Sequence, residues 1–234
     1  MPSRNTVKEF VSDSYYHLYN RGNNKQKIFL DDQDVAVFLS YLKEYLMLKD
    51  QKALSATLLA VDTPWRIKDH AKKLLRMNNF FDKITLLCYC LMPNHFHFLI
   101  HQKGENDMDA FMNSLCTRYT MYFNKKYKRV GPLFQSVYKA VLIISEEQLL
   151  YITRYIHRNC LSLHRYSRSL SAILQEYTSS SYLDYVGLRK TEWVHPNPIL
   201  AFFSKRKGMT YESFVVQSDD DVSQTIVYEK TLDE

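Results

Sequence analysis

Residues 88–102 read CYCLMPNHFHFLIHQ, and this stretch decides the fold that we predict for the chain. Successive side chains of a β-strand point to opposite faces of its sheet. His95 and His97 should therefore share one face, while Phe96 and Phe98 share the other. Two imidazoles over a sheet, with two aromatic rings beneath them in the core, are a layout that metal-dependent chemistry can use.

The residues before the histidines predict the rest of a hairpin. The apolar run over residues 84–92 is typical of a buried strand, and Pro93 and Asn94 supply a turn. We expect two antiparallel strands, with the histidines at the start of the second.

The remaining elements follow from hydrophobic periodicity. We predict a strand over residues 14–20, helices over 31–46 and 106–126, a strand over 137–144, and a helix from Ser145 to about Asn159. This order is typical of an α+β fold, a ferredoxin-like or RRM-like sandwich with a four-stranded antiparallel sheet and helices on one face. Residues 50–82 are predicted to be a helical insertion, with a short basic helix over 70–77.

The charge divides the chain. Its 31 basic and 25 acidic residues give a net charge of +6, but residues 217–234 hold six of the acids and one of the bases. The remaining 30 bases and 19 acids leave residues 1–216 with a net charge of +11, which favours a polyanionic partner. We predict a domain over 1–164, a C-terminal extension over 165–216 that packs on or beside it, and a disordered acidic tail over 217–234.

The cysteines and the apolar runs indicate a cytoplasmic protein. The four cysteines form no CxxC pair and lie mostly in apolar runs, as buried reduced thiols do. No apolar run approaches the roughly 18 residues that span a membrane, and residues 1–10 lack a signal-peptide core. We expect no membrane partner.

Cations and rings alternate at the end of the second long helix. Three tyrosines lie among five basic residues, Arg118, Lys125, Lys126, Lys128 and Arg129. Cations that bind phosphates, interleaved with rings that stack on bases, suit single-stranded nucleic acid. A solvated helix end with its tyrosines in the core is the alternative.

The last predicted helix carries a polar row. Tyr151, Tyr155 and Asn159 stand four residues apart and so follow one face, about 6 Å between neighbours. A tyrosine beside a two-histidine metal site can act as a nucleophile, and the Asn159 carbonyl oxygen can serve as a third ligand for a hard cation. Taken singly, these residues are more often structural.

Taken together, these motifs resemble the HUH single-tyrosine transposases. His95, Phe96 and His97 are similar to the HUH motif, within residues 91–100 (LMPNHFHFLI). Further similar segments are 16–22 (YHLYNRG), 131–135 (GPLFQ) and 154–159 (RYIHRN). Residues 177–187 and 199–203 resemble the C-terminal extension of the subgroup associated with repetitive extragenic palindromes (REP). The resemblance covers roughly residues 14–46 and 84–215.

The resemblance implies roles for four residues. His95, His97 and Asn159 would bind Mg²⁺ or Mn²⁺, and Tyr155 would attack single-stranded DNA to give a 5′-phosphotyrosine and a free 3′-OH. Arg154 lies in the same motif and is a further candidate for DNA binding. The implied partner is single-stranded DNA with hairpin or palindromic elements, and the implied location is the cytoplasm, at the bacterial nucleoid. Both a monomer and a homodimer that exchanges its tyrosine helices are known arrangements in the family.

Three features depart from the family pattern. Residues 50–82 are longer than the usual connection, and Cys160 stands where the family often has proline. Tyr151 precedes Tyr155 by one turn, as in two-tyrosine relatives, so it is a candidate second nucleophile.

Two other functions compete with DNA strand transfer. A non-catalytic nucleic-acid-binding regulator would keep the fold and the basic residues, but would not require the four site residues. A zinc hydrolase would use His95 and His97 with His101 or His17, although no carboxylate stands at a spacing that suggests a general base.

Overall fold

The computed structural model of the chain describes residues 10–160, 169–204 and 208–217. This part contains the strands β1 (Ser14–Arg21), β2 (Ile84–Met92), β3 (His95–Gln102) and β4 (Lys139–Ile143). The longer helices are α1 (Asp32–Leu46), α2 (Gln51–Leu59), α3 (Trp65–Arg76), α4 (Asp107–Lys126) and α5 (Glu146–Arg158). Four short helices follow, α6 (Leu170–Glu176), α7 (Tyr182–Tyr185), α8 (Asn197–Ser204) and α9 (Tyr211–Val216).

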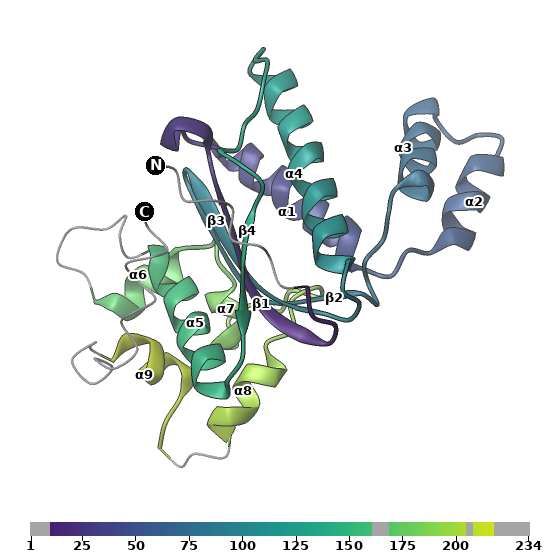
Figure 1. Ribbon diagram of the computed structural model, residues 1–234. Helices are drawn as coiled ribbons and strands as arrows, with labels where there is room; N and C mark the ends of the chain where they lie inside the picture. The colour runs from purple at the N-terminus through teal and green to yellow at the C-terminus, as the bar shows by residue number, and fades with distance from the viewer. Residues whose placement is uncertain (1–9, 161–168, 205–207, 218–234) are drawn as a thin grey trace.

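The four strands form one antiparallel sheet in the order β2-β3-β1-β4 (Figure 1). The hairpin β2-β3 is the one predicted from residues 84–102, and β1 pairs with β3 so that His97 faces Tyr19 across the ladder. This order is that of a ferredoxin-like sandwich, in which each of two strand-helix units contributes a central strand. The predicted α+β fold is confirmed.

One face of the sheet is covered by α1 and α4 (Figure 1). Phe96 and Phe98 of β3 point into this layer with ring centroids 4.7 Å apart, and Phe38 of α1 lies 5.4 Å from Phe96. All three are fully buried, as are Phe111 and Tyr119 of α4. The alternation read from the sequence therefore places the phenylalanines of β3 in the core.

The opposite face is covered by α5 and the C-terminal helices (Figure 1). Ser145 caps α5 by accepting a hydrogen bond from the Gln148 backbone, as predicted. The Gln148 side chain accepts from the Ile144 N–H, one residue before the cap. Ile152 and Ile156 pack from α5 into a second core that also contains Leu99 of β3. The sheet is thus buried on both faces, whereas the sequence predicted helices on one face, because α5 and the extension also bury apolar side chains against the sheet.

Helices α2 and α3 form the predicted insertion and pack mainly on each other. Figure 1 shows them projecting from the body of the molecule, beyond the ends of α1 and α4. The basic helix predicted over residues 70–77 begins earlier, at Trp65, because Pro64 is accepted at the N-cap and the amphipathic pattern already starts there.

Several predictions concern residues that are not described. The predicted tail lies outside the described residues from 218 onward, and so does the predicted boundary between residues 164 and 165. The division into domains stays a prediction. The four cysteines carry free thiols, and Cys88, Cys90 and Cys160 are buried. Among the described helices, none has the length and apolar character needed to cross a membrane.

Candidate active site

Two histidines of β3 lie on the face of the sheet that α5 covers. His97 is 3% exposed and His95 is partly exposed. Their rings are nearly perpendicular, with centroids 5.0 Å apart. Both side chains therefore lie on the face opposite Phe96, as the strand alternation predicts.

Each histidine uses its Nδ1 atom for a hydrogen bond inside the protein. His95 Nδ1 lies 2.6 Å from the Asn94 side-chain oxygen, and His97 Nδ1 lies 2.9 Å from Nε2 of His17 on β1. With Nδ1 hydrogen-bonded, either imidazole would bind a cation through Nε2, since neutral imidazole ligates through one nitrogen while the other is hydrogen-bonded.

His17 is a member of this site that the sequence indicated only as an alternative zinc ligand. It is fully buried and stacks on His97 with ring centroids 5.1 Å apart. Burial lowers the pKa of His17 to about 3 and the pKa of His97 well below its ordinary value, so both are neutral near pH 7.

The direction of the hydrogen bond between His17 and His97 decides whether His97 can bind a cation through Nε2. Coordination requires a lone pair on Nε2, so the proton must sit on His97 Nδ1 and be donated to His17. His17 then carries its own proton on Nδ1, an atom that is buried and has no hydrogen-bond partner in the part of the chain that the structure describes.

Tyr155 of α5 lies beside His97 and His17. Its ring centroid is 5.6 Å from that of His97 and 5.9 Å from that of His17, in both cases with an edge-to-face orientation. Tyr151, one turn earlier, packs against the second core. The predicted nucleophile and one predicted metal ligand thus meet within a single chain, although about 60 residues separate them in the sequence.

Asn159 ends the polar row of α5 at its C-cap. Its side-chain Nδ2 donates a hydrogen bond to the Tyr155 carbonyl, at 2.9 Å. This bond orients the amide one turn beyond the tyrosine. The role of Asn159 as a metal ligand stays a prediction.

His95 and His97 fit a hard divalent cation only if the Asn159 side-chain oxygen completes the set of ligands. Two imidazoles and an amide oxygen are compatible with Mg²⁺ or Mn²⁺, although imidazole alone also suits zinc. In the described residues no group of three or more His, Cys, Asp or Glu side chains is placed to hold a metal. His101, the other candidate zinc ligand, instead lies 3.0 Å from Asp13.

Two of the basic residues predicted to bind DNA are engaged in packing between α4 and α1. Arg118 forms an ion pair with Glu44 and lies over the Tyr41 ring. Lys126 forms an ion pair with the buried carboxylate of Asp34, at 2.7 Å. The interpretation of these cations as phosphate ligands stays a prediction.

The other predicted DNA-binding residues differ in exposure. Lys125 and Lys128 are exposed, and Arg129 is partly exposed with its guanidinium 5.5 Å from the Phe123 ring. Arg154 is buried, donates to the Gln217 carbonyl and lies 5.6 Å from the Phe214 ring of α9. Their contact with DNA is likewise a prediction.

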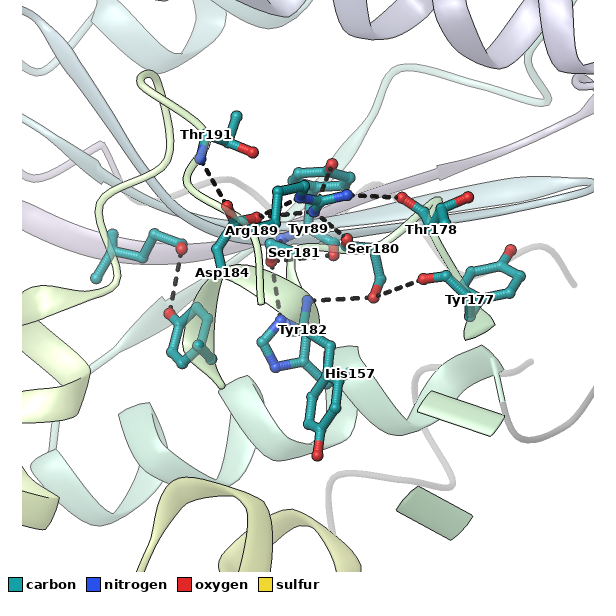
Figure 2. A network of polar contacts seen from close by, with 12 residues as sticks. Tyr89, His157, Tyr177, Thr178, Ser180, Ser181, Tyr182, Asp184, Arg189 and Thr191 are labelled. Atoms are coloured by element: carbon teal, nitrogen blue, oxygen red, sulfur yellow. Dashed lines mark hydrogen bonds and ion pairs between the residues drawn. The ribbon is translucent and has the colours of Figure 1, made fainter. Parts of the chain in front are cut away.

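A buried polar network joins the tyrosine helix to the extension, and Figure 2 shows its centre. His157 of α5 contacts the Ser181 hydroxyl through Nε2 at 2.8 Å and the Tyr211 hydroxyl through Nδ1 at 2.6 Å. Ser181 also accepts a hydrogen bond from the Tyr89 N–H of β2, at 2.8 Å (Figure 2). Helix α5 is therefore connected through one histidine to α9 and to the sheet.

An ion pair between Arg189 and Asp184 stabilises the segment that carries Ser181. Arg189 lies 2.7 Å from Asp184, which is almost fully buried, and also donates to the Ser180 carbonyl (Figure 2). Asp184 in turn accepts from the Thr191 N–H at 2.7 Å. The extension thereby links α5, which carries Tyr155, to the sheet through Ser181.

Part of the chain is similar to a known protein family. Residues 60–159 match the family model described as Transposase IS200 like. This region contains His95, His97, Tyr155 and Asn159. None of the curated protein sequences compared with the chain is significantly similar to it.

Two solved structures are distantly similar. One is a REP-associated tyrosine transposase bound to a REP hairpin, 10% identical, with 81% of this chain and 96% of that chain covered and a TM-score of 0.48. The other is a proposed transposase from Deinococcus radiodurans, 17% identical, with 65% of this chain and 95% of that chain covered and a TM-score of 0.27. Both likenesses are too weak to transfer a ligand or a residue's role to this chain.

Proposed function

We propose that this chain, whose residues 60–159 match the model of the IS200-like transposase family, cleaves and rejoins single-stranded DNA with Tyr155 as its nucleophile. The observation that carries this proposal is the contact of the Tyr155 ring with His97, at 5.6 Å between centroids. A tyrosine at that position can reach a phosphate held beside the histidines.

In the proposed reaction the free energy of the broken phosphodiester bond is kept in a covalent bond between DNA and the protein. The Tyr155 oxygen attacks phosphorus as the bond from phosphorus to the 3′ oxygen breaks, which gives a 5′-phosphotyrosine and a leaving 3′ oxygen. The tyrosine loses its phenolic proton and the 3′ oxygen gains one. The reverse attack, by a 3′-OH on the phosphotyrosine, rejoins strands without a nucleotide cofactor.

His95, His97 and Asn159 would hold Mg²⁺ or Mn²⁺. When bound, the cation would polarise a non-bridging phosphate oxygen and stabilise negative charge on the pentavalent phosphorus. His17 would orient His97 by accepting its Nδ1 proton, and Asn94 would orient His95 in the same way. The burial of His97 keeps its imidazole neutral, which coordination requires.

The site is built from one chain, which supports cleavage in cis. The His157 network holds α5 on the sheet that carries the histidines of the same molecule. The motifs in residues 177–187 and 199–203 support assignment to the REP-associated subgroup and hence a hairpin-bearing substrate. Both motifs also pack against α5 or the sheet. Ser181 of the first hydrogen-bonds to His157, and Ile199 of the second is buried in the second core.

The test is covalent capture of DNA. The protein is incubated with Mn²⁺ and a set of hairpin-bearing single-stranded oligonucleotides labelled on the 3′ side of candidate cleavage positions, then separated under denaturing conditions. We expect a labelled adduct with wild type and with Tyr151→Phe, which removes a hydroxyl one turn away. Tyr155→Phe should form none.

Two outcomes contradict the proposal. An adduct that persists in Tyr155→Phe but disappears in Tyr151→Phe assigns the nucleophile to Tyr151. Equal backgrounds in all three proteins across the oligonucleotide set, with chelator-resistant DNA binding, would support a non-catalytic regulator.

A further inference from the structure

Helix α3 carries a basic row that the proposed active site does not use, in which Lys72 and Arg76 are exposed and Lys68 is partly exposed. Of residues 51–76 in α2, α3 and their connection, only Ala71 is buried. The pair of helices is nevertheless anchored at its base, where Asn79 donates to the Met47 carbonyl at 2.8 Å and Phe80 is buried in the first core. Helices α2 and α3 are thus exposed to solvent, while residues 79 and 80 attach them to the rest of the domain (Figure 1).

The helical repeat places one tryptophan in the basic row. With about 100° per residue, Trp65, Lys68, Lys72 and Arg76 fall within one sector of about 80°, at spacings of one turn. Ile67, Ala71 and Leu74 lie about 100–160° around the helix from the centre of this row, and Ala71 is the buried residue among them. Trp65 is 74% exposed and therefore belongs to the cationic face rather than to the packing face.

The cations of this row are available to a partner. Within α3 the one acid, Asp69, pairs with Lys73 at 2.6 Å. Among the residues that the structure describes, no carboxylate forms an ion pair with Lys68, Lys72 or Arg76. An exposed indole among cations one turn apart matches what single-stranded nucleic acid requires, a ring for a base and charges for successive phosphates.

We propose that α3 is a second binding site for single-stranded DNA, in which a base stacks on Trp65 while Lys68, Lys72 and Arg76 bind the backbone. The site lies on the insertion, apart from Tyr155, and would hold DNA that flanks the cleaved position. The DNA partner rests on the proposed function, whereas binding at α3 does not depend on cleavage.

A membrane surface is the other partner that a basic amphipathic helix suits. In a helix that lies on a bilayer, the aromatic residue belongs on the apolar face, which enters the lipid. Here Trp65 is on the cationic face, and the apolar face offers Ile67 as its one exposed large side chain within α3, because Ala71 is buried. The geometry therefore favours DNA.

Tryptophan fluorescence tests the proposal, because the chain has two tryptophans and the other, Trp193, is buried against Tyr89. Full-length protein is titrated with a single-stranded oligonucleotide that carries a hairpin and an unpaired flank. We expect the flank to quench the fluorescence of wild type. Trp65→Phe should abolish this quenching because it removes the fluorophore, and Trp65→Ala should weaken binding about 5- to 100-fold, the effect of losing one stacked base.

The charges are tested separately through salt dependence. Replacing Lys68, Lys72 and Arg76 together with Gln should reduce the slope of log Kd against log salt by about 2, at about 0.7 per phosphate contact. Lys52→Gln, an exposed cation on α2, is the matched control and should leave the slope unchanged. Circular dichroism melts confirm that each variant is folded.

The outcomes separate this inference from the proposed cleavage. Quenching that persists in Trp65→Phe, or an unchanged slope in the triple variant, overturns the inference even when the Tyr155 adduct forms. Loss of quenching in Trp65→Phe supports it even if no adduct is found. A response of Trp65 to vesicles of anionic phospholipid but not to the oligonucleotide would overturn the inference and assign α3 to a lipid surface.

Discussion

Acid should destabilise the protein in part through His157, the buried histidine that connects α5 to the extension. Its two ring nitrogens contact Ser181 and Tyr211, and burial lowers its pKa to about 3. In the unfolded chain an imidazole has a pKa of about 6.5. Above that pH neither state binds the proton, whereas between about 6.5 and 3 only the unfolded chain does, so the free energy of unfolding falls as the pH falls.

The size of the effect follows from linkage. One proton taken up only by the unfolded state costs about 1.4 kcal/mol per pH unit below 6.5, which amounts to about 2 kcal/mol at pH 5. His17, with its pKa also lowered to about 3, and His97 act in the same direction. Their contribution cancels when wild type is compared with a variant at position 157.

The variant is His157→Gln, measured by urea unfolding at pH 7.5 and pH 5.0. At pH 7.5 it should be less stable than wild type by about 1–3 kcal/mol, because a buried hydrogen-bonding group is replaced by a poorer match. At pH 5.0 the difference should shrink by about 2 kcal/mol. His70→Gln, at an exposed histidine of α3, is the matched control. Parallel pH dependence of wild type and His157→Gln between these two values would refute the reasoning.

Three further outcomes are expected. His17→Ala should raise the Mn²⁺ concentration that gives half-maximal DNA adduct about 10- to 100-fold, with excess Mn²⁺ restoring the yield, since His17 orients His97; an unchanged metal titration would contradict this role. Asp34→Ala should lower the free energy of unfolding by about 3 kcal/mol in urea titrations, because its buried carboxylate accepts hydrogen bonds from Lys126 and two tyrosines; a loss below about 1 kcal/mol would be inconsistent with that network. Burial raises the pKa of the Cys88 and Cys90 thiols well above the ordinary value. Both thiols should therefore resist alkylation at pH 8 until denaturant is added, as followed by peptide mass spectrometry. Rapid alkylation of the native protein would argue against this packing.

Local periodicity was enough to predict the four strands, the helices α1, α4 and α5, and the faces of β3. The alternation of histidine and phenylalanine over residues 95–98 is a property of any β-strand, so it holds whatever surrounds it. The cap of α5 at Ser145 and the polar row of Tyr155 and Asn159 are likewise set within a few residues. The element order then left few topologies for the sheet.

The partners of the charged residues could not be predicted in the same way. Arg118 and Lys126 lie among tyrosines in the sequence, a pattern that also suits nucleic acid. The structure pairs them with Glu44 and Asp34, which are 74 and 92 residues away. No local pattern contains that information, because it depends on how α1 and α4 pack across the sheet.

The sequence by itself determined that two histidines share one face of a strand and that a tyrosine and an asparagine share one face of a helix, since both facts follow from backbone geometry. Only the tertiary structure decided that these faces meet. The sheet register brings His17 to His97 from 80 residues away, and burial of the apolar side of α5 then places Tyr155 beside both rings. The extension contributes the last constraint, through His157 and Ser181, because burying a polar imidazole costs less free energy when both of its nitrogens find partners.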